Sequence, residues 1–130
     1  MARILIAEDE PALRGYLRRG LQESGHTITA AADGAEALEL LIQAEGDFDL
    51  LLADIKMPMM DGIALALAAA RSYPRLAILL MTGHPDQRTR TSGLDGLIHG
   101  LLPKPFTLAE LKFEVAAALA SRRSDRPARD

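Results

Sequence analysis

Short runs rich in β-forming residues alternate with longer amphipathic segments along the chain. The short runs are Arg3 to Ala7, Thr27 to Ala31, Asp49 to Ala53, Leu76 to Met81 and Gly96 to Leu102. The segments between them repeat apolar residues at helical spacing, a pattern that is typical of βαβ units in a parallel sheet. The pattern therefore predicts an α/β protein with five strands.

The helical segments differ in how clearly their residue pattern predicts a stable helix. The expected helices are Pro11 to Ser24, Ala35 to Ala44, a segment that follows Asp61-Gly62 and ends before Pro74, Pro85 to Gly93, and Leu108 to Ala120. In the first of them, Leu13, Leu17 and Leu21 form one apolar stripe. Pro85 to Gly93 is polar and almost free of apolar residues, so we expect it to be the weakest helix and the least stable part of the fold.

The composition is that of an ordinary globular domain. The chain has 130 residues, of which 48% are hydrophobic and 25% charged, and it contains no cysteine. A chain of this length buries roughly two thirds of its unfolded surface in one core. We therefore expect one domain over residues 1–120, a short disordered tail at 121–130, and no separate output domain. The lack of cysteine excludes a disulfide framework, a thiolate zinc site and a cysteine nucleophile.

The N-terminus lacks the features of a targeting or membrane segment. MARILIAEDE carries three acids within ten positions, so it has no long apolar core of a signal peptide. The longest apolar stretches, Leu50 to Ala53 and Ala64 to Ala70, are far shorter than the ~20 residues that cross a bilayer. We expect a cytoplasmic protein that does not enter a membrane.

The charge is distributed unevenly. The formal net charge is −3, but residues 121–130 hold four arginines and two aspartates, which leaves a net charge of −5 on the first 120 residues. An acidic body is a poor nucleic-acid surface, because phosphate binding needs a basic stripe. We therefore expect no nucleic-acid partner, and we interpret the basic end as a solvated tail.

Charged and hydroxyl side chains follow the predicted strands. In a doubly wound parallel sheet, all strands end at one edge, and ligands bind outside that edge where the strand order reverses. The residues that follow the first, third, fourth and fifth strands are Glu8 with Asp9 and Glu10, then Asp54, Thr82 and Lys104. Topology alone therefore gathers carboxylates, a hydroxyl and an ammonium group at one place.

The carboxylates of this group need protons or a cation. Close carboxylates repel one another, and Asp54 follows the apolar run Leu50 to Ala53, where loss of hydration requires a compensating partner. Mg²⁺ is the cation that fits this group best, because it needs only one or two carboxylates and keeps several waters. Each acid alone is best interpreted as a helix cap or a solvated loop residue, but the set with Thr82 and Lys104 favours a metal-dependent site.

Four motifs occur in order along residues 2–120. They are Glu8-Asp9 after the first strand, Asp54 in ADIKMPMMDG, Thr82-Gly83, and Lys104-Pro105-Phe106. Together they resemble the receiver domain of two-component response regulators. The resemblance implies a flavodoxin-like (CheY-like) fold, in which five helices flank a doubly wound, five-stranded parallel sheet of order 2-1-3-4-5.

The same resemblance implies a phospho-acceptor switch that depends on Mg²⁺. The phosphoryl group would come from a sensor histidine kinase or a histidine phosphotransfer protein. The implied site residues are Asp54 as acceptor, Thr82 and Lys104 as contacts of the phosphoryl group, and, as Mg²⁺ ligands, Asp9, Asp54, the backbone carbonyl of Lys56 and, through water, Glu8. A preplaced metal ion, ammonium and hydroxyl suit the charge that develops during phosphoryl transfer.

Some positions depart from the usual pattern of the family. Leu101 stands where many receivers carry an aromatic residue, so we expect the signal to pass through the loop after Thr82 rather than through a rotating ring. Pro103 removes one backbone donor directly before Lys104. Pro105 occupies the position of the family's cis peptide, and we expect a cis bond here.

Lys56 and His84 flank the phosphoryl site by the same analogy. They lie two residues beyond Asp54 and Thr82, respectively. Because side chains at these positions govern water access in receivers, we expect Lys56 to shield the phosphoryl group and slow its hydrolysis.

The expected role is that of a single-domain switch. Among such regulators the chain is most similar to the CpdR type, which implies an adaptor whose docking surface regulates protease machinery. The alternative is a phosphorelay intermediate or phosphate sink that hands its phosphoryl group to a phosphotransfer protein. In both cases we expect no enzyme activity beyond self-phosphorylation and autodephosphorylation.

Two functions outside this family fit the sequence less well. A small Mg²⁺-dependent phosphatase usually has an Asp-x-Asp motif after the first strand and a cap region, whereas this chain has Glu8-Asp9-Glu10-Pro11 there. A flavodoxin-like cofactor binder needs a loop rich in Gly, Ser and Thr at the same place. Three acids in that loop would repel a flavin phosphate.

Overall fold

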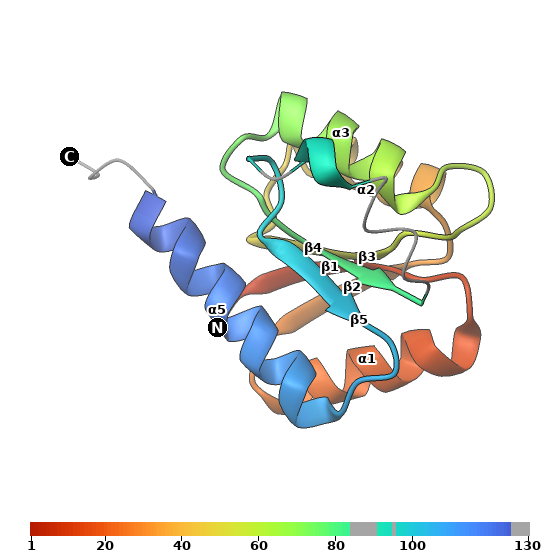
Figure 1. Cartoon of the computed structure of the whole chain (residues 1–130), viewed down its shortest axis with the longest axis vertical. Helices are drawn as coiled ribbons and strands as arrows, with labels where there is room; N and C mark the ends of the chain where they lie inside the picture. The colour runs from red at the N-terminus through yellow and green to blue at the C-terminus, as the bar shows by residue number, and fades with distance from the viewer. Residues whose placement is uncertain (84–90, 95, 126–130) are drawn as a thin grey trace.

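Five parallel strands form one sheet in the computed structural model, which describes residues 1–83, 91–94 and 96–125 (Figure 1). The strands are β1 (Arg3–Ala7), β2 (Thr27–Ala31), β3 (Leu50–Asp54), β4 (Ala77–Thr82) and β5 (Gly100–Pro103). Their order is β2-β1-β3-β4-β5, so the predicted doubly wound α/β sheet is confirmed. The strand order reverses between the neighbouring strands β1 and β3: β2 lies on one side of this pair, and β4 and β5 follow on the other side.

The described part of the chain also contains four α-helices and one 3-10 turn. They are α1 (Pro11–Glu23), α2 (Gly34–Gln43), α3 (Gly62–Ser72), α5 (Leu108–Asp125) and η1 (Ser92–Leu94). The weak helix predicted at Pro85 to Gly93 falls mainly on residues 84–90, which lie outside the described residues, as does His84. Among the helices that are described, none is long and apolar enough to span a membrane.

The last helix is longer than predicted. α5 begins at Leu108, where Thr107 and Glu110 form reciprocal hydrogen bonds of 2.8 and 3.0 Å, as in a capping box. It continues past Ala120 to Asp125, because the sequence has no glycine or proline between Leu108 and Pro127. Residues 126–130 of the expected tail lie outside the described residues.

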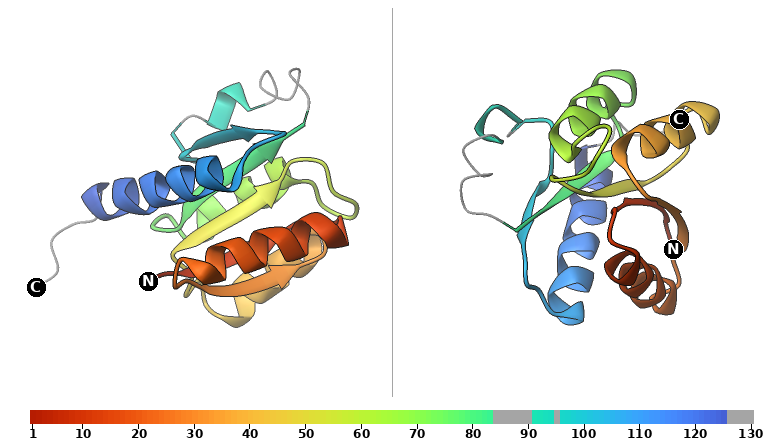
Figure 2. Two further views of the ribbon diagram at one scale, coloured as in Figure 1. Left: turned by 90° about the horizontal axis from the view of Figure 1, so that it is seen from below. Right: turned by 90° about the vertical axis from the view of Figure 1, so that its right-hand side faces the viewer.

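Helices cover both faces of the sheet. On one face, Leu51 lies in a buried cluster with Leu65 of α3, and α2 contributes to the same cluster. On the other face, Leu52 lies in a second cluster with Leu17 of α1 and with residues of α5. Figure 2 shows α1 and α5 as neighbours on that side. The central strands are therefore buried on both faces, which explains why β3 is a continuous apolar run rather than an alternating one.

The strand ends differ from the prediction by small amounts. β3 and β4 each begin and end one residue later than predicted. Their ends extend because backbone pairing continues beyond the last apolar residue of each strand. Asp54 is thus the last residue of β3 and lies opposite Met81. β5 is shorter than predicted, because the N–H groups of Leu97 and Ile98 turn back to the carbonyl oxygen of Leu94 at 2.7 and 3.0 Å.

Candidate functional site

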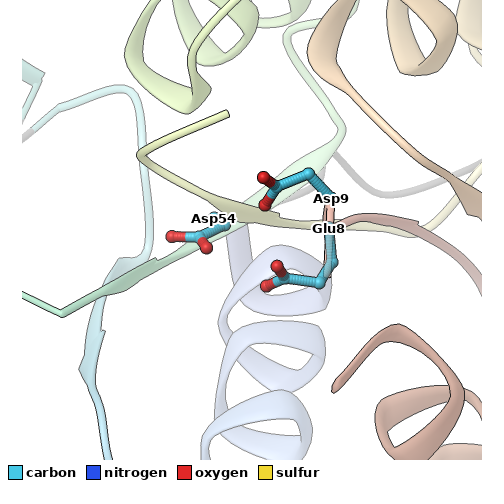
Figure 3. Close-up of side chains that lie close together, drawn as sticks. All are labelled: Glu8, Asp9 and Asp54. Atoms are coloured by element: carbon cyan, nitrogen blue, oxygen red, sulfur yellow. The ribbon is translucent and has the colours of Figure 1, made fainter. Parts of the chain in front are cut away.

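Three carboxylates meet where β1 and β3 end side by side. Glu8 and Asp9 directly follow β1, and Asp54 ends β3. The parallel register pairs Ala7 with Ala53, so the next residue of each strand lies at the same edge of the sheet. One carboxylate oxygen of each acid lies within 4.8 Å of those of the other two (Figure 3). We call these three residues the acidic cluster.

The acids of the cluster differ in burial. Glu8 is 1% exposed and Asp54 is 6% exposed, whereas Asp9 is exposed. The Glu8 side chain folds back so that its Oε2 accepts the backbone N–H of Glu10 at 3.1 Å. Two carboxylates have therefore lost most of their water, and each requires a compensating partner.

Lys104 brings a cation to both buried carboxylates. Its Nζ donates to Oδ2 of Asp54 at 2.7 Å and to Oε1 of Glu8 at 3.4 Å. Its backbone N–H donates to the carbonyl oxygen of Thr82 at 2.7 Å, which joins the ends of β4 and β5. The peptide bond between Lys104 and Pro105 is cis, as predicted.

Burial and charge shift the protonation of these groups. Burial raises the pKa of Glu8 to about 7; the charge of Asp54 adds to this effect, and the N–H of Glu10 and the charge of Lys104 oppose it. Burial by itself lowers the pKa of Lys104, but the hydrogen bond to Asp54 and the charge of that residue outweigh it, so the pKa is raised. The lysine thus stays charged beside a carboxyl group that exchanges its proton near neutral pH.

Thr82 completes the row of polar residues along this edge. It is buried at the end of β4, where Met81 lies opposite Asp54 and Thr82 lies opposite Pro103. Thr82 therefore stands between the strand ends that carry the acceptor candidate and the lysine. A Cβ at the next residue, Gly83, would lie 4.0 Å from Cδ of Lys104, so the glycine sits against the lysine side chain.

The segment after Asp54 is packed tightly against the end of β3. The N–H of Gly62 donates to the carbonyl oxygen of Ile55 at 2.7 Å, and a Cβ at Gly62 would lie 2.2 Å from the carbonyl oxygen of Asp54. Only glycine fits such a close approach. Lys56 lies in this segment with an exposed side chain, and the role of its backbone carbonyl stays a prediction.

The donor set suits a small, hard cation. Mg²⁺ binds oxygen at about 2.0–2.1 Å, so two ligands on opposite sides of the ion lie roughly 4.2 Å apart. One carboxylate oxygen from each acid of the cluster lies within 4.8 Å of the other two, an upper limit slightly above that span. The residues present therefore fit Mg²⁺, with water as the remaining ligands.

A groove beside Lys104 was not predicted from the sequence. It has a volume of about 490 Å³ and is lined by Glu10, Leu13, Tyr16, Gly83, Lys104, Pro105 and Phe106. Tyr16 is 40% exposed and Phe106 is half-buried, so the groove presents aromatic surface next to the lysine. Its walls come from α1 and from the segment between β5 and α5. Its two aromatic residues are Tyr16, seven residues beyond Asp9, and Phe106, the last residue of the Lys104-Pro105-Phe106 motif.

Comparison with known proteins places the chain among signalling domains. Residues 4–116 match the family model described as response regulator receiver domain. The response regulator MprA of Mycobacterium ulcerans is 38% identical over 117 residues, which make up 90% of this chain and 50% of that protein. The sensor kinase CckA of Brucella abortus is 34% identical over 118 residues, 91% of this chain and 12% of that protein. The chain thus spans half or less of the length of these relatives.

Solved structures give the same result for the fold. A response regulator receiver domain protein from Clostridium thermocellum has a TM-score of 0.87 at 22% identity, with 95% of this chain and 98% of that chain covered. The response regulator protein TrrA of Thermotoga maritima, solved in complex with Mg²⁺-BeF, has a TM-score of 0.81 at 33% identity, with 91% of this chain and 99% of that chain covered. The similarity in both cases extends over most of the chain.

Proposed function

This chain belongs to the response regulator receiver domain family, and from that membership we propose that Asp54 accepts a phosphoryl group from a sensor histidine kinase or a histidine phosphotransfer protein. The observation that carries the proposal is the setting of Asp54. It is buried at a strand end, its Oδ2 lies 2.7 Å from Nζ of Lys104, and two further acids lie beside it. Such a carboxylate is held in place together with the groups that phosphoryl transfer requires.

The transfer exchanges one bond to phosphorus for another. A carboxylate oxygen of Asp54 bonds to the phosphorus of the donor phosphohistidine while the P–N bond breaks. The electron pair of that bond leaves with the imidazole nitrogen. Charge builds up on the equatorial oxygens during this step. In this proposal the Lys104 ammonium pairs with one of these oxygens and the Thr82 hydroxyl donates to another, so that both groups stabilise the charge that develops in the transition state.

The acidic cluster holds the metal ion in this proposal. Asp9 and Asp54 are direct ligands, Glu8 acts through water, and Lys56 contributes its backbone carbonyl. The support is the spacing of the three carboxylates and the similarity to TrrA, which was solved in complex with Mg²⁺-BeF. Bound Mg²⁺ supplies positive charge beside the phosphoryl oxygens.

The groove beside Lys104 offers the donor protein a docking surface. It opens next to the lysine that contacts Asp54, and Tyr16 and Phe106 give it aromatic walls. Aromatic side chains at the rim of a reactive centre are effective anchors for a protein partner. Asp54 does not line the groove itself, but Lys104 lines it and contacts Asp54, so a partner seated here would lie next to the proposed acceptor site.

Two roles follow for the phosphorylated protein. The resemblance to the CpdR type supports a docking surface that regulates protease machinery. The match to 118 residues of a sensor kinase favours instead a relay or phosphate-sink role. Phosphorylation-dependent affinity for a partner supports the first role, and transfer from Asp54 to a histidine of a phosphotransfer protein supports the second.

The test is phosphorylation of the protein by Mg²⁺ and a small phosphodonor such as acetyl phosphate, read by intact mass. We expect one phosphoryl group on the wild type and none on Asp54→Asn. Asp33→Asn is the matched control, because Asp33 is a half-buried helix cap outside the acidic cluster and asparagine caps a helix equally well. A phosphoryl group that persists in Asp54→Asn contradicts the assignment of the acceptor.

A further inference from the structure

The loop that carries Glu8 and Asp9 has few anchors of its own. The N–H of Glu8 donates to the carbonyl oxygen of Ala31 at 3.1 Å, and beyond it the chain leaves the sheet. α1 begins only at Pro11, and its N-cap, Glu10, makes no side-chain capping hydrogen bond. The peptide groups on either side of Asp9 therefore lie between the last strand contact and the first helical turn.

Arg14 of α1 binds both of these peptide groups. Its Nη1 donates to the carbonyl oxygen of Glu8 at 2.8 Å and, more weakly, to that of Asp9 at 3.4 Å. The first carbonyl belongs to the peptide that precedes the Asp9 Cα, and the second belongs to the peptide that follows it. Fixing both peptide planes fixes φ and ψ of Asp9, and thereby the direction in which its carboxylate leaves the backbone.

The position of Arg14 is not explained by helix stability. It is the fourth residue of α1, near the positive end of the helix dipole, where a cation is unfavourable. Arg14 is half-buried, and its guanidinium donates to backbone carbonyl oxygens. Its fixed, planar set of N–H groups suits the simultaneous binding of two acceptors, which a lysine does less well.

We propose that Arg14 is a positioning residue of the acidic cluster: by holding the two peptide groups around Asp9, it aims the Asp9 carboxylate at Asp54 and so sets the affinity for Mg²⁺. This inference rests on the metal site of the proposed function. It goes beyond that proposal by giving a role to a residue that neither binds the ion nor contacts the phosphoryl group.

The sign of the effect separates positioning from simple electrostatics. Removing a positive charge near a cation site strengthens Mg²⁺ binding if only charge matters. Loss of a residue that orients a metal ligand instead weakens binding, typically by 10-fold or more. Arg14→Ala therefore gives opposite results under the two explanations.

The experiment is a calorimetric titration of the full chain with MgCl₂, with amide hydrogen exchange at Asp9 and Glu10 as the second measurement. We expect Arg14→Ala to weaken Mg²⁺ binding by about 10-fold or more and to speed exchange at both amides. Arg14→Lys and Arg14→Gln each keep a donor, so they are expected to fall between Arg14→Ala and the wild type. Arg18→Ala is the matched control, because it removes the same charge from an exposed position on the same helix.

Each outcome decides a separate point. A wild type that binds no Mg²⁺ overturns the metal site itself. A wild type that binds Mg²⁺, together with an Arg14→Ala variant that binds it equally or more tightly, overturns only the positioning role. If Arg14→Ala does not fold, the comparison of Arg14→Gln with Arg18→Ala carries the same decision.

Discussion

Lys104 and Asp54 form an ion pair across two strand ends, with Nζ 2.7 Å from Oδ2 and with 25% and 9% of the two side chains exposed. The pair stands where the proposed phosphoryl group would enter. The lysine would therefore change partners on phosphorylation, from carboxylate oxygens to phosphoryl oxygens. The contact also compensates for the burial of Asp54 and Glu8 in the unmodified protein.

Replacing Lys104 with methionine should destabilise the protein in the absence of Mg²⁺. The variant leaves two buried carboxylates without their cation, and we expect the free energy of unfolding to fall by about 1.5–3 kcal/mol. Urea unfolding measures the change. Lys112→Met is the control, because Lys112 lies 4.0 Å from Glu23 in an exposed pair worth at most ~1 kcal/mol. Equal losses of unfolding free energy in the two variants would mean that the buried ion pair stabilises the protein no more than the exposed pair does.

Truncating the aromatic walls of the groove should slow phosphorylation by a donor protein but not phosphorylation by a small phosphodonor. We expect Tyr16→Ala and Phe106→Ala to slow phosphorylation by a donor protein about 10-fold, which corresponds to loss of roughly 1.4 kcal/mol of docking energy. Phosphorylation by acetyl phosphate should stay unchanged, because a small donor needs no docking surface. Phe113→Ala removes an aromatic side chain that is 70% exposed on α5 and serves as control. A donor protein that phosphorylates both groove variants as fast as the wild type must dock elsewhere.

Lys56→Asn should shorten the lifetime of the phosphorylated protein. Lys56 is exposed two residues beyond Asp54, and a long cation at that position shields the phosphoryl group from water better than a short amide. We expect dephosphorylation to be several-fold faster, as measured by the decay of the phosphorylated mass after donor removal. Lys112→Asn makes the same exchange on α5, outside the segment that follows Asp54, and should leave the decay unchanged. An unchanged or longer lifetime in Lys56→Asn removes the shielding role.

His26 should make the stability depend on pH. Its Nδ1 accepts the backbone N–H of Ala2 at 3.1 Å, and burial together with the nearby N-terminal charge lowers its pKa from the ordinary 6.5. The neutral form is thus favoured in the folded state. Its contribution is present above pH 6.5 and is lost as the pH falls through the lower, folded-state pKa.

The measurement for His26 is the free energy of unfolding between pH 7.5 and pH 5, in steps, for the wild type and for His26→Asn. Asparagine still offers an acceptor but does not titrate, so the variant should lose less stability on acidification. His99→Asn replaces an exposed histidine and should follow the wild type. Identical curves for His26→Asn and the wild type would rule out the effect.

Met59→Gly should stabilise the protein. Met59 has a φ of 70° and is 84% exposed, so it adopts a left-handed conformation without packing in return. Glycine adopts this conformation without the steric penalty of a Cβ but loses more chain entropy on folding, and we expect a net gain of about 0.5–1 kcal/mol. Met59→Ala keeps the Cβ and should give no gain. A gain of the same size in both variants would point to the side chain rather than the backbone.

The sequence predicted the sheet and its acidic edge well, for a topological reason. Once the strands are known to be parallel, Glu8, Asp9, Asp54 and Lys104 must share one edge, whatever their detailed conformations. The assigned roles of these residues stay predictions until phosphorylation is measured. Strand ends were off by one residue in β3 and β4, because side-chain polarity does not report where backbone pairing stops.

Other parts of the site could not be predicted in this way. The contact of Arg14 with two carbonyl oxygens depends on a side-chain rotamer and on the entry angle of α1, neither of which leaves a periodic signal. The groove depends on how α1 packs beside the segment that follows β5. Such features arise from tertiary packing between distant segments, and this packing leaves no local pattern in the sequence.

The wide sequence separation of the charged contacts has a consequence for biosynthesis. Lys104 lies 50 residues from Asp54 and 96 residues from Glu8, although it touches both. A nascent chain that has released only its first three strands from the ribosome already contains Asp54, the proposed acceptor, but still lacks Lys104. Under the proposed function, the complete set of charged groups therefore forms only once β5 has joined the sheet, and a chain that ends before Lys104 would lack the ammonium group of the site.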